Sequence, residues 1–240
     1  MAEEEKEIRM KKIFLVTVTA LSMVVVFFMS GVCAADETIQ TKLQAMLDAR
    51  FAAYKATNNL PSNLGILVHV QSPAGAWTAR VGLPAGAENA HYRIASVSKT
   101  FTAAAIMLLD QQGKLNIQDF VTDTIPGKAI PYLPDSPAYA IPNKSKIRIW
   151  HLMSHRAGIF DVFNWPILNP PYNGQTYNAY VADATNDPFH QFTLDELAKV
   201  ISDNKLFSKA PDVEYKYSDT GYTLLARIIE QVSGKSYDAF

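Results

Sequence analysis

An apolar, alanine-rich segment with a polar entrance constrains this chain most. It runs from Arg93 to Leu115 and reads RIASVSKTFTAAAIMLLDQQGKL. Alanine, leucine and methionine favour helix, and Gly113 is the kind of residue that commonly ends one. We therefore expect an apolar helix that ends at Gly113 and has Ser96, Ser98 and Lys99 at its N-terminus.

The spacing of Ser96 and Lys99 indicates nucleophilic catalysis. The two residues are three positions apart, so on a helix their side chains point the same way. A partly desolvated lysine can take the proton of a serine hydroxyl, because burial lowers the pKa of the lysine. Unpaired amides and the dipole at a helix N-terminus stabilise a developing oxyanion. The ordinary alternative is a capping serine beside a surface lysine. Ser98 is expected to face elsewhere and to bond locally.

The same spacing occurs a second time and serves as an internal comparison. Ser202 and Lys205 lie at a polar helix end with no apolar helix after them. We interpret this second pair as solvated surface, so the spacing alone is weak evidence for a site.

The first 35 residues are typical of an export signal. Basic residues at Arg9, Lys11 and Lys12 precede an apolar run over 13–29, and small residues follow up to Ala35. This pattern predicts a signal peptide over 1–35 and a mature domain over 36–240, periplasmic or secreted. The alternative is an uncleaved anchor, although a run of 17 residues is short for a membrane span. The membrane would then be a partner only through this segment.

The overall composition indicates a globular protein with no nucleic-acid partner. Hydrophobic residues make up 48% and charged residues 19% of the chain, as in globular proteins. A net charge of −1 gives no overall field that would attract nucleic acid. Cys33 is the only cysteine and lies in the signal segment, so we expect no disulfide. Acidic residues ahead of Arg9 leave open whether Met1 or Met10 is the start.

Hydrophobic periodicity and turn residues predict the remaining elements. Five prolines between Pro126 and Pro142 exclude a long helix there. A loop rich in asparagine, proline and tyrosine is expected over 163–189, and it could line a cleft or be a surface excursion. The predicted elements are a helix over 38–57, a hairpin of strands 64–71 and 76–81, a short helix within 146–159, a helix over 193–202 and a final helix that stops at Gly234.

Three motifs together resemble one family of enzymes. SVSKTFTA, IRIWHLMSHRAGIFD and EYKYSDTGYTLLARIIEQVSGKSYDAF follow one another in the chain. They resemble the serine β-lactamase superfamily, and within it the group of class C β-lactamases, secreted D-alanyl-D-alanine carboxypeptidases and related serine esterases. Members carry Ser-x-x-Lys at the mouth of a buried helix, then a stretch like ITIRHLLSHTSGL, and later YSNTGYxLLGxIIExVSGxSY. The resemblance covers roughly residues 63–240.

The resemblance implies a role for each motif residue. Ser96 would be the acyl-accepting nucleophile, Lys99 its general base or proton partner, and Tyr217 the second proton carrier. Asp219 falls where the family usually has an asparagine that binds the substrate amide. A carboxylate only accepts hydrogen bonds. Beside Lys99 it would raise the pKa of the lysine and weaken it as a base. Arg156 is a further departure, because it places a cation in SHRAG where the family stretch reads SHTSG.

The resemblance also implies a fold. The expected class is α/β of the α+β kind, β-lactamase/transpeptidase-like, with a central antiparallel sheet flanked by helices and a mostly helical subdomain at about 116–220. Members carry a third motif, [H/K]-[T/S/A]-G, on a later strand, and nothing after Asp219 fits it. We therefore expect a partial domain, truncated at its C-terminus, in which only the N-terminal hairpin of the sheet is present.

The motifs predict an extracytoplasmic serine hydrolase that acts through an acyl-serine intermediate. Its partner would be a small-molecule or peptide substrate: a β-lactam, a D-alanyl-D-alanine peptide, or a small ester or amide. No cofactor is expected. The alternative is a non-catalytic penicillin-binding or sensing module on the same fold.

Two other chemistries are less well supported by the sequence. His151 and His155 are four residues apart, but no glutamate follows His151 to make a zinc motif. We therefore assign them capping and packing roles and predict no metal. A Gly-x-Ser-x-Gly elbow, typical of α/β-hydrolases, does not occur in the chain.

Overall fold

The computed structural model describes residues 39–58, 63–185, 187 and 189–240. The predicted signal peptide over 1–35 lies outside the described residues. The chain divides between Arg93 and Ile94 into two compact units, which are considered separately below. The predicted helical subdomain at about 116–220 falls within the second unit and stays a prediction.

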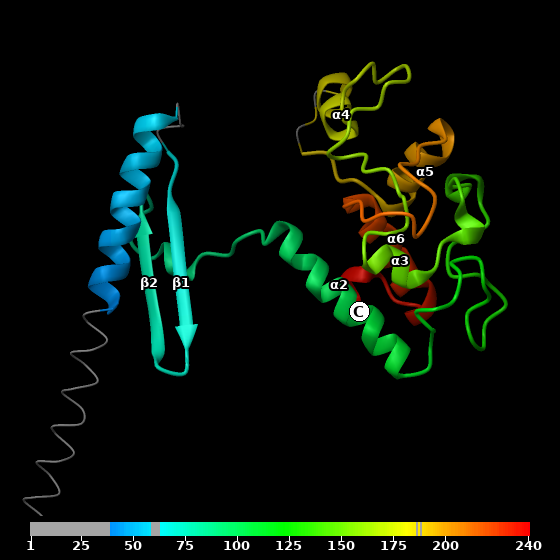
Figure 1. Ribbon diagram of the computed structural model, residues 1–240, viewed down its shortest axis with the longest axis horizontal. Helices are drawn as coiled ribbons and strands as arrows, with labels where there is room; N and C mark the ends of the chain where they lie inside the picture. The colour runs from blue at the N-terminus through cyan, green and yellow to red at the C-terminus, as the bar shows by residue number, and fades with distance from the viewer. Residues whose placement is uncertain (1–38, 59–62, 186, 188) are drawn as a thin grey trace, which may run out of the picture. The chain divides into compact units, whose positions relative to one another are not determined.

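A helix over 39–57 and a β-hairpin form the first unit (Figure 1). Strand β1 (Ile66–Ser72) pairs antiparallel with β2 (Gly75–Val81), and Ser72 lies opposite Gly75. Only two residues therefore connect the strands, within the predicted turn. The hairpin expected from the sequence is confirmed.

Two glutamines of the helix satisfy backbone groups of β2. The Gln40 amide donates to Thr78 O at 2.7 Å and accepts from Thr78 N at 3.2 Å. The Gln44 amide makes the same pair of bonds to Arg80, at 2.8 and 3.2 Å. The two side chains thus bond to this strand much as a neighbouring strand would, which covers backbone groups that a sheet edge leaves open.

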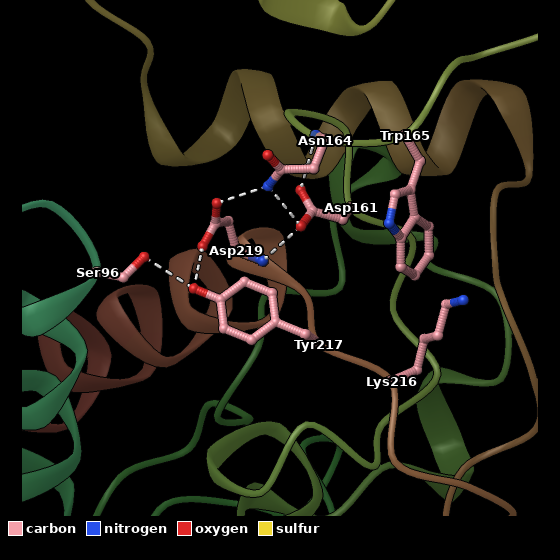
Figure 2. Close-up of a pocket in the computed structure, with 7 residues that line it drawn as sticks. All are labelled: Ser96, Asp161, Asn164, Trp165, Lys216, Tyr217 and Asp219. Atoms are coloured by element: carbon pink, nitrogen blue, oxygen red, sulfur yellow. Dashed lines mark hydrogen bonds between the residues drawn. The ribbon is translucent and has the colours of Figure 1, made fainter. Parts of the chain in front are cut away.

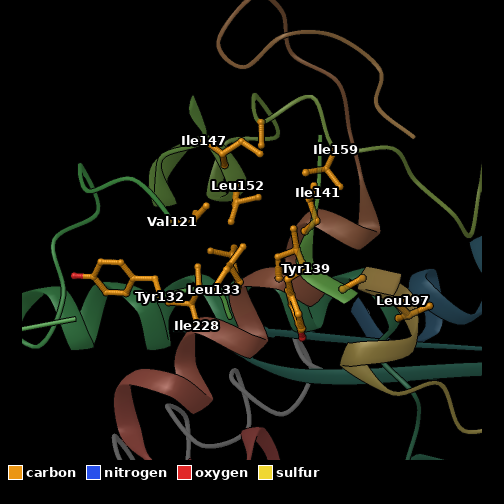
Figure 3. Packing of buried hydrophobic residues seen from close by; sticks show 14 of the residues in the cluster. Val121, Tyr132, Leu133, Tyr139, Ile141, Ile147, Leu152, Ile159, Leu197 and Ile228 are labelled. Carbon is orange, nitrogen blue, oxygen red and sulfur yellow. The ribbon is translucent and has the colours of Figure 1, made fainter. Parts of the chain in front are cut away.

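The second unit is mostly helical, and α6 (Asp219–Ser233) lies at its centre. Helix α6 packs against α2 (Ser98–Gln111), α3 (Ile149–Met153) and α5 (Leu194–Asn204). Its apolar face is buried and carries Leu224, Leu225, Ile228, Ile229 and Val232. Figure 3 shows Ile228 among the aliphatic and tyrosine side chains of this core.

Local signals fix the ends of these helices. Ser218 caps α6, since its hydroxyl accepts from Gly221 N at 3.1 Å, and Gly234 ends the helix with a φ of 73°. Thr193 and Glu196 form a reciprocal capping box at the start of α5. Helix α2 is followed by Gly113 at a φ of 66°. The predicted end at Gly113, the predicted helix over 193–202 and the predicted stop at Gly234 agree with the structure to within about two residues.

One predicted loop is wrong. The segment expected to be irregular over 163–189 contains α4 (Tyr177–Thr185). Tyr177 and Val181, four residues apart, are both buried. The stretch holds no proline or glycine, so nothing in it opposes a helix once one face is covered. The proline-rich connection over 126–142, by contrast, contains only a short 3-10 turn, as expected.

The architecture combines helices with a small antiparallel sheet, which is the expected α+β class. Within the described residues, no helix has both the length and the apolar character needed to cross a bilayer.

Candidate active site

A tight turn presents Ser96 at the start of α2. Ala95 has a φ of 44°, in the left-handed region, and a 3-10 turn over Ala95–Val97 leads directly into the helix. The Ser98 hydroxyl donates to Ala95 O at 2.6 Å and so closes the turn. Ser98 therefore bonds locally, as predicted, while Ser96 is left exposed at the helix entrance.

The structure brings the four predicted site residues together, and Figure 2 shows three of them, Ser96, Tyr217 and Asp219. Lys99 Nζ donates to Ser96 Oγ at 3.2 Å, and Ser96 Oγ lies 2.8 Å from the hydroxyl of Tyr217. The Tyr217 hydroxyl also donates to Asp219 Oδ1 at 3.0 Å. Lys99 forms an ion pair with the same carboxylate oxygen. Residues more than 100 positions apart in the chain thus form one continuous network.

Asp219 holds Lys99 in its charged form. Burial favours the neutral amine, but the interactions with Asp219 and Tyr217 outweigh it, and the pKa of Lys99 lies above its ordinary value. Burial likewise opposes ionisation of Asp219. Hydrogen bonds from Lys99, Asn164 and Tyr217 more than offset this effect, so the pKa of Asp219 lies below its usual range. The pair is therefore an ammonium and a carboxylate at neutral pH.

His155 packs against the ring of Tyr217. Its ring stacks on the ring of Tyr217 with centroids 4.4 Å apart. Its Nδ1 accepts from Ser218 N at 3.2 Å, and its carbonyl accepts from Lys216 N at 2.7 Å. Burial and the nearby charge of Lys99 lower the pKa of His155, which keeps the imidazole neutral and able to accept. The predicted packing role of this histidine is confirmed.

His151 has the predicted capping role. It is buried, and its Nδ1 accepts from Arg148 N at 3.0 Å at the start of α3. Among the described residues, no group of three or more histidine, cysteine, aspartate or glutamate side chains is arranged to hold a metal ion.

Two site residues were missed by the sequence reasoning, Asp161 and Asn164. The Asp161 side chain is fully buried and accepts from four groups. These are Phe163 N, Asn164 N, Asn164 Nδ2 and Asp219 N, at 3.1, 3.3, 2.9 and 3.1 Å. Asp161 thereby ties the loop after α3 to the first residue of α6. The signal was available in part, since Asp161 ends the motif IRIWHLMSHRAGIFD.

These residues surround an open pocket beside Ser96, with a volume of about 480 Å³. Figure 2 shows Trp165 and Lys216 on the far side of the pocket from Ser96. Lys216 Nζ lies 4.8 Å from the centre of the Trp165 ring, within cation–π range. The pocket is lined by Ser96, Asp161, Asn164, Trp165, Lys216, Tyr217 and Asp219.

The second serine–lysine pair forms no comparable site. We expected Ser202 to be solvated. Its hydroxyl instead donates a hydrogen bond to Pro137 O at 2.7 Å. Lys205 ends α5 in the left-handed conformation, with a φ of 51°. The two residues share only their spacing with Ser96 and Lys99.

Comparison with known proteins identifies the relatives of this chain. The family model described as Beta-lactamase matches residues 63–240. Penicillin-binding protein 4* of Bacillus subtilis is 30% identical over 152 residues, which is 63% of this chain and 27% of the relative. A putative D-alanyl-D-alanine carboxypeptidase of Salmonella typhimurium is 28% identical over 153 residues, 63% of this chain and 31% of the relative. The matches thus span about three-tenths of the length of these relatives.

Solved structures share the fold at lower sequence identity. A D-stereospecific amidohydrolase from Streptomyces sp. matches with a TM-score of 0.56 and 22% identity, over 76% of this chain and 47% of that structure. The D-amino acid amidase from Ochrobactrum anthropi SV3 matches with a TM-score of 0.54 and 22% identity, over 82% and 49%. At this identity the similarity establishes the fold alone.

Proposed function

Because this chain belongs to the beta-lactamase family, we propose that it is a serine hydrolase in which Ser96 forms the acyl intermediate. One observation carries the proposal. Ser96 Oγ lies 3.2 Å from Lys99 Nζ and 2.8 Å from the Tyr217 hydroxyl, beside an open pocket. A nucleophile with two proton-transferring groups in hydrogen-bond reach is the arrangement that covalent catalysis requires.

The proposed reaction has two halves. Ser96 Oγ attacks the substrate carbonyl while neutral Lys99 takes the serine proton, and amides at the start of α2 stabilise the oxyanion. Tyr217 gives its proton to the leaving group and regains one from Lys99, so the protons balance. Water then attacks the acyl-serine by the reverse path, which releases the acid and restores Ser96. The side chains of these three residues carry out the attack and the proton transfers, and the backbone amides bind the oxyanion.

The substrate class and the location are also proposals. Candidate substrates are β-lactams, D-alanyl-D-alanine peptides, and small esters or amides. Names among the relatives, penicillin-binding protein and D-alanyl-D-alanine carboxypeptidase, support this range. The signal segment predicted over 1–35 supports a periplasmic or secreted protein that contacts a small-molecule or peptide substrate.

A fluorophosphonate tests the proposal, because it reacts irreversibly with activated serines. We expect it to abolish p-nitrophenyl ester hydrolysis by the full-length protein in a time-dependent way. Ser96→Ala should hydrolyse no ester, whereas Ser202→Ala should behave like the wild type. Equal ester hydrolysis by Ser96→Ala would contradict the proposal. Labelling of Ser96 with no turnover of any candidate substrate would instead identify the binding or sensing module.

The pH dependence of hydrolysis should report on Asp219. The reaction needs neutral Lys99, so kcat/KM rises as the pH passes the pKa of Lys99. Asp219 raises that pKa, and Asp219→Asn removes the charge responsible. We therefore expect the acid limb of the profile to move to lower pH in this variant.

A matched control separates this effect from a general change of charge. Asp203→Asn makes the same substitution in an exposed pair with Lys199 on α5, and its acid limb should stay where the wild-type limb lies. If the acid limb of Asp219→Asn also stays in place, the ion pair with Lys99 does not control catalysis.

A further inference from the structure

Asp219 Oδ2 is a hydrogen-bond acceptor on the wall of the pocket. The asparagine that is usual at this position has one oxygen and one NH₂ group, so it would offer one acceptor and one donor. Asp219 Oδ1 is occupied by Lys99 and Tyr217. Asp219 Oδ2 accepts only from Asn164 Nδ2, at 2.8 Å, among the described residues. The side chain is 28% exposed. A carboxylate oxygen has room for a second donor, and it has no hydrogen to give.

The orientation of Asn164 follows from its neighbours. Its Nδ2 donates to Asp161 Oδ2 at 2.9 Å and to Asp219 Oδ2 at 2.8 Å. Two carboxylates can be faced only by the NH₂ end of an amide, because both accept and neither donates. Figure 2 shows the Asn164 nitrogen turned to the carboxylates and its oxygen turned away from them. Within the described part of the chain, that oxygen accepts no hydrogen bond.

The wall of the pocket next to Ser96 therefore offers Asp219 Oδ2 as an acceptor, and Asp219 and Asn164 have no free side-chain donor among the described contacts. We infer that this wall selects acyl donors that carry a free amino group beside the scissile carbonyl, and that it disfavours the N-acylated forms of the same compounds. The protonated form of a free amine presents only N–H donors to the wall. An N-acyl group adds a carbonyl oxygen, which would meet a carboxylate with no hydrogen between them.

Net charge is not the basis of this selection. Lys99 already pairs with Asp219, and the second carboxylate of the pocket, Asp161, already accepts four hydrogen bonds from the protein. Hydrogen-bond complementarity distinguishes the two kinds of substrate, and discrimination of this type is strong because mismatched polar groups are left unpaired. The inference rests on the proposed function, since it concerns the substrate of the acyl transfer at Ser96.

The test compares two substrates that differ only in N-acetylation. Alanine p-nitroanilide and N-acetylalanine p-nitroanilide of the same chirality are given to the full-length protein, and kcat/KM is measured for each. We expect the wild type to prefer the free amine. Asp219→Asn gives the wall a donor, so the ratio of the two kcat/KM values should move toward the acetylated substrate by about ten- to a hundredfold.

The ratio removes effects that both substrates share. A change in the protonation of Lys99 alters both rates at a given pH and cancels. Asp203→Asn, in the exposed pair on α5, should leave the ratio at its wild-type value.

The outcomes separate this inference from the proposed function. A wild type that prefers the acetylated substrate overturns the inference, and so does an unchanged ratio in Asp219→Asn. A protein that fluorophosphonate labels on Ser96, yet that hydrolyses neither anilide, also overturns it while leaving the serine nucleophile in place. Absence of any reaction at Ser96 contradicts the proposed function itself.

Discussion

Tyr217→Phe is expected to lower kcat/KM for ester hydrolysis by about 10²- to 10⁴-fold, the usual contribution of a positioned acid or base. The substitution removes the hydroxyl that lies 2.8 Å from Ser96 Oγ and 3.0 Å from Asp219 Oδ1. It keeps the ring that stacks on His155. The loss therefore falls on proton transfer more than on folding. Steady-state kinetics of the full-length protein measure it.

Tyr222→Phe is the matched control for that variant. The Tyr222 ring also lies near the lysine, with its centre 5.6 Å from Lys99 Nζ. Its hydroxyl, however, donates to Met153 O at 2.9 Å and not to Ser96, whose tyrosine partner is Tyr217. We expect a loss of about 1 kcal/mol of stability and nearly unchanged kcat/KM. Equal kinetic losses in the two variants would show that Tyr217 acts through packing.

Gly158→Ala should destabilise the folded protein by at least about 3 kcal/mol. Gly158 has a φ of 69°, and an added Cβ would lie 2.0 Å from the backbone oxygen of Lys209. Backbone cannot move aside as the end of a side chain can, and Gly158 O also accepts from Ser208 N at 2.9 Å. The substitution thus combines a strained conformation with a clash against a held segment. Urea denaturation of the full-length protein measures the effect.

Gly174→Ala isolates the conformational part of that penalty. Gly174 has a φ of 90°, and an added Cβ would meet no atom within 4 Å. The loss of stability should come only from placing a residue with a side chain in the left-handed conformation, which costs about 1–2 kcal/mol. If both glycine variants lose the same stability, the close approach of Lys209 does not constrain Gly158.

The local parts of the site could be predicted from the sequence. The spacing of Ser96 and Lys99, the glycine after α2 and the serine before α6 are signals that act over a few residues. The effect of Asp219 on Lys99 was also predictable once the family resemblance placed the two motifs together. Each of these inferences rests on one short segment, or on two motifs whose relationship is known from the family.

The remaining parts depend on contacts that the sequence does not display. Asn164 reaches Asp219 across 55 residues, and Asp161 reaches the Asp219 amide across 58. Asn164 comes from a loop that shows no regular pattern, and Asp161 is only the last residue of a motif, so neither side chain could be placed. Helix α4 was missed for a related reason. Its buried face is covered by aromatic residues such as Tyr172 and Phe192, and tertiary packing of this kind overrides weak local preference.

The position of a covalent adduct tests the role of Ser96 most directly. The full-length protein is treated with a fluorophosphonate, digested with trypsin and mapped by mass spectrometry. The adduct is expected in the peptide IASVSK, residues 94–99, and fragmentation of that peptide should place it on Ser96 and not on Ser98. An adduct on Ser98 or Ser202, or undiminished labelling of Ser96→Ala, would contradict the assignment of Ser96 as the nucleophile.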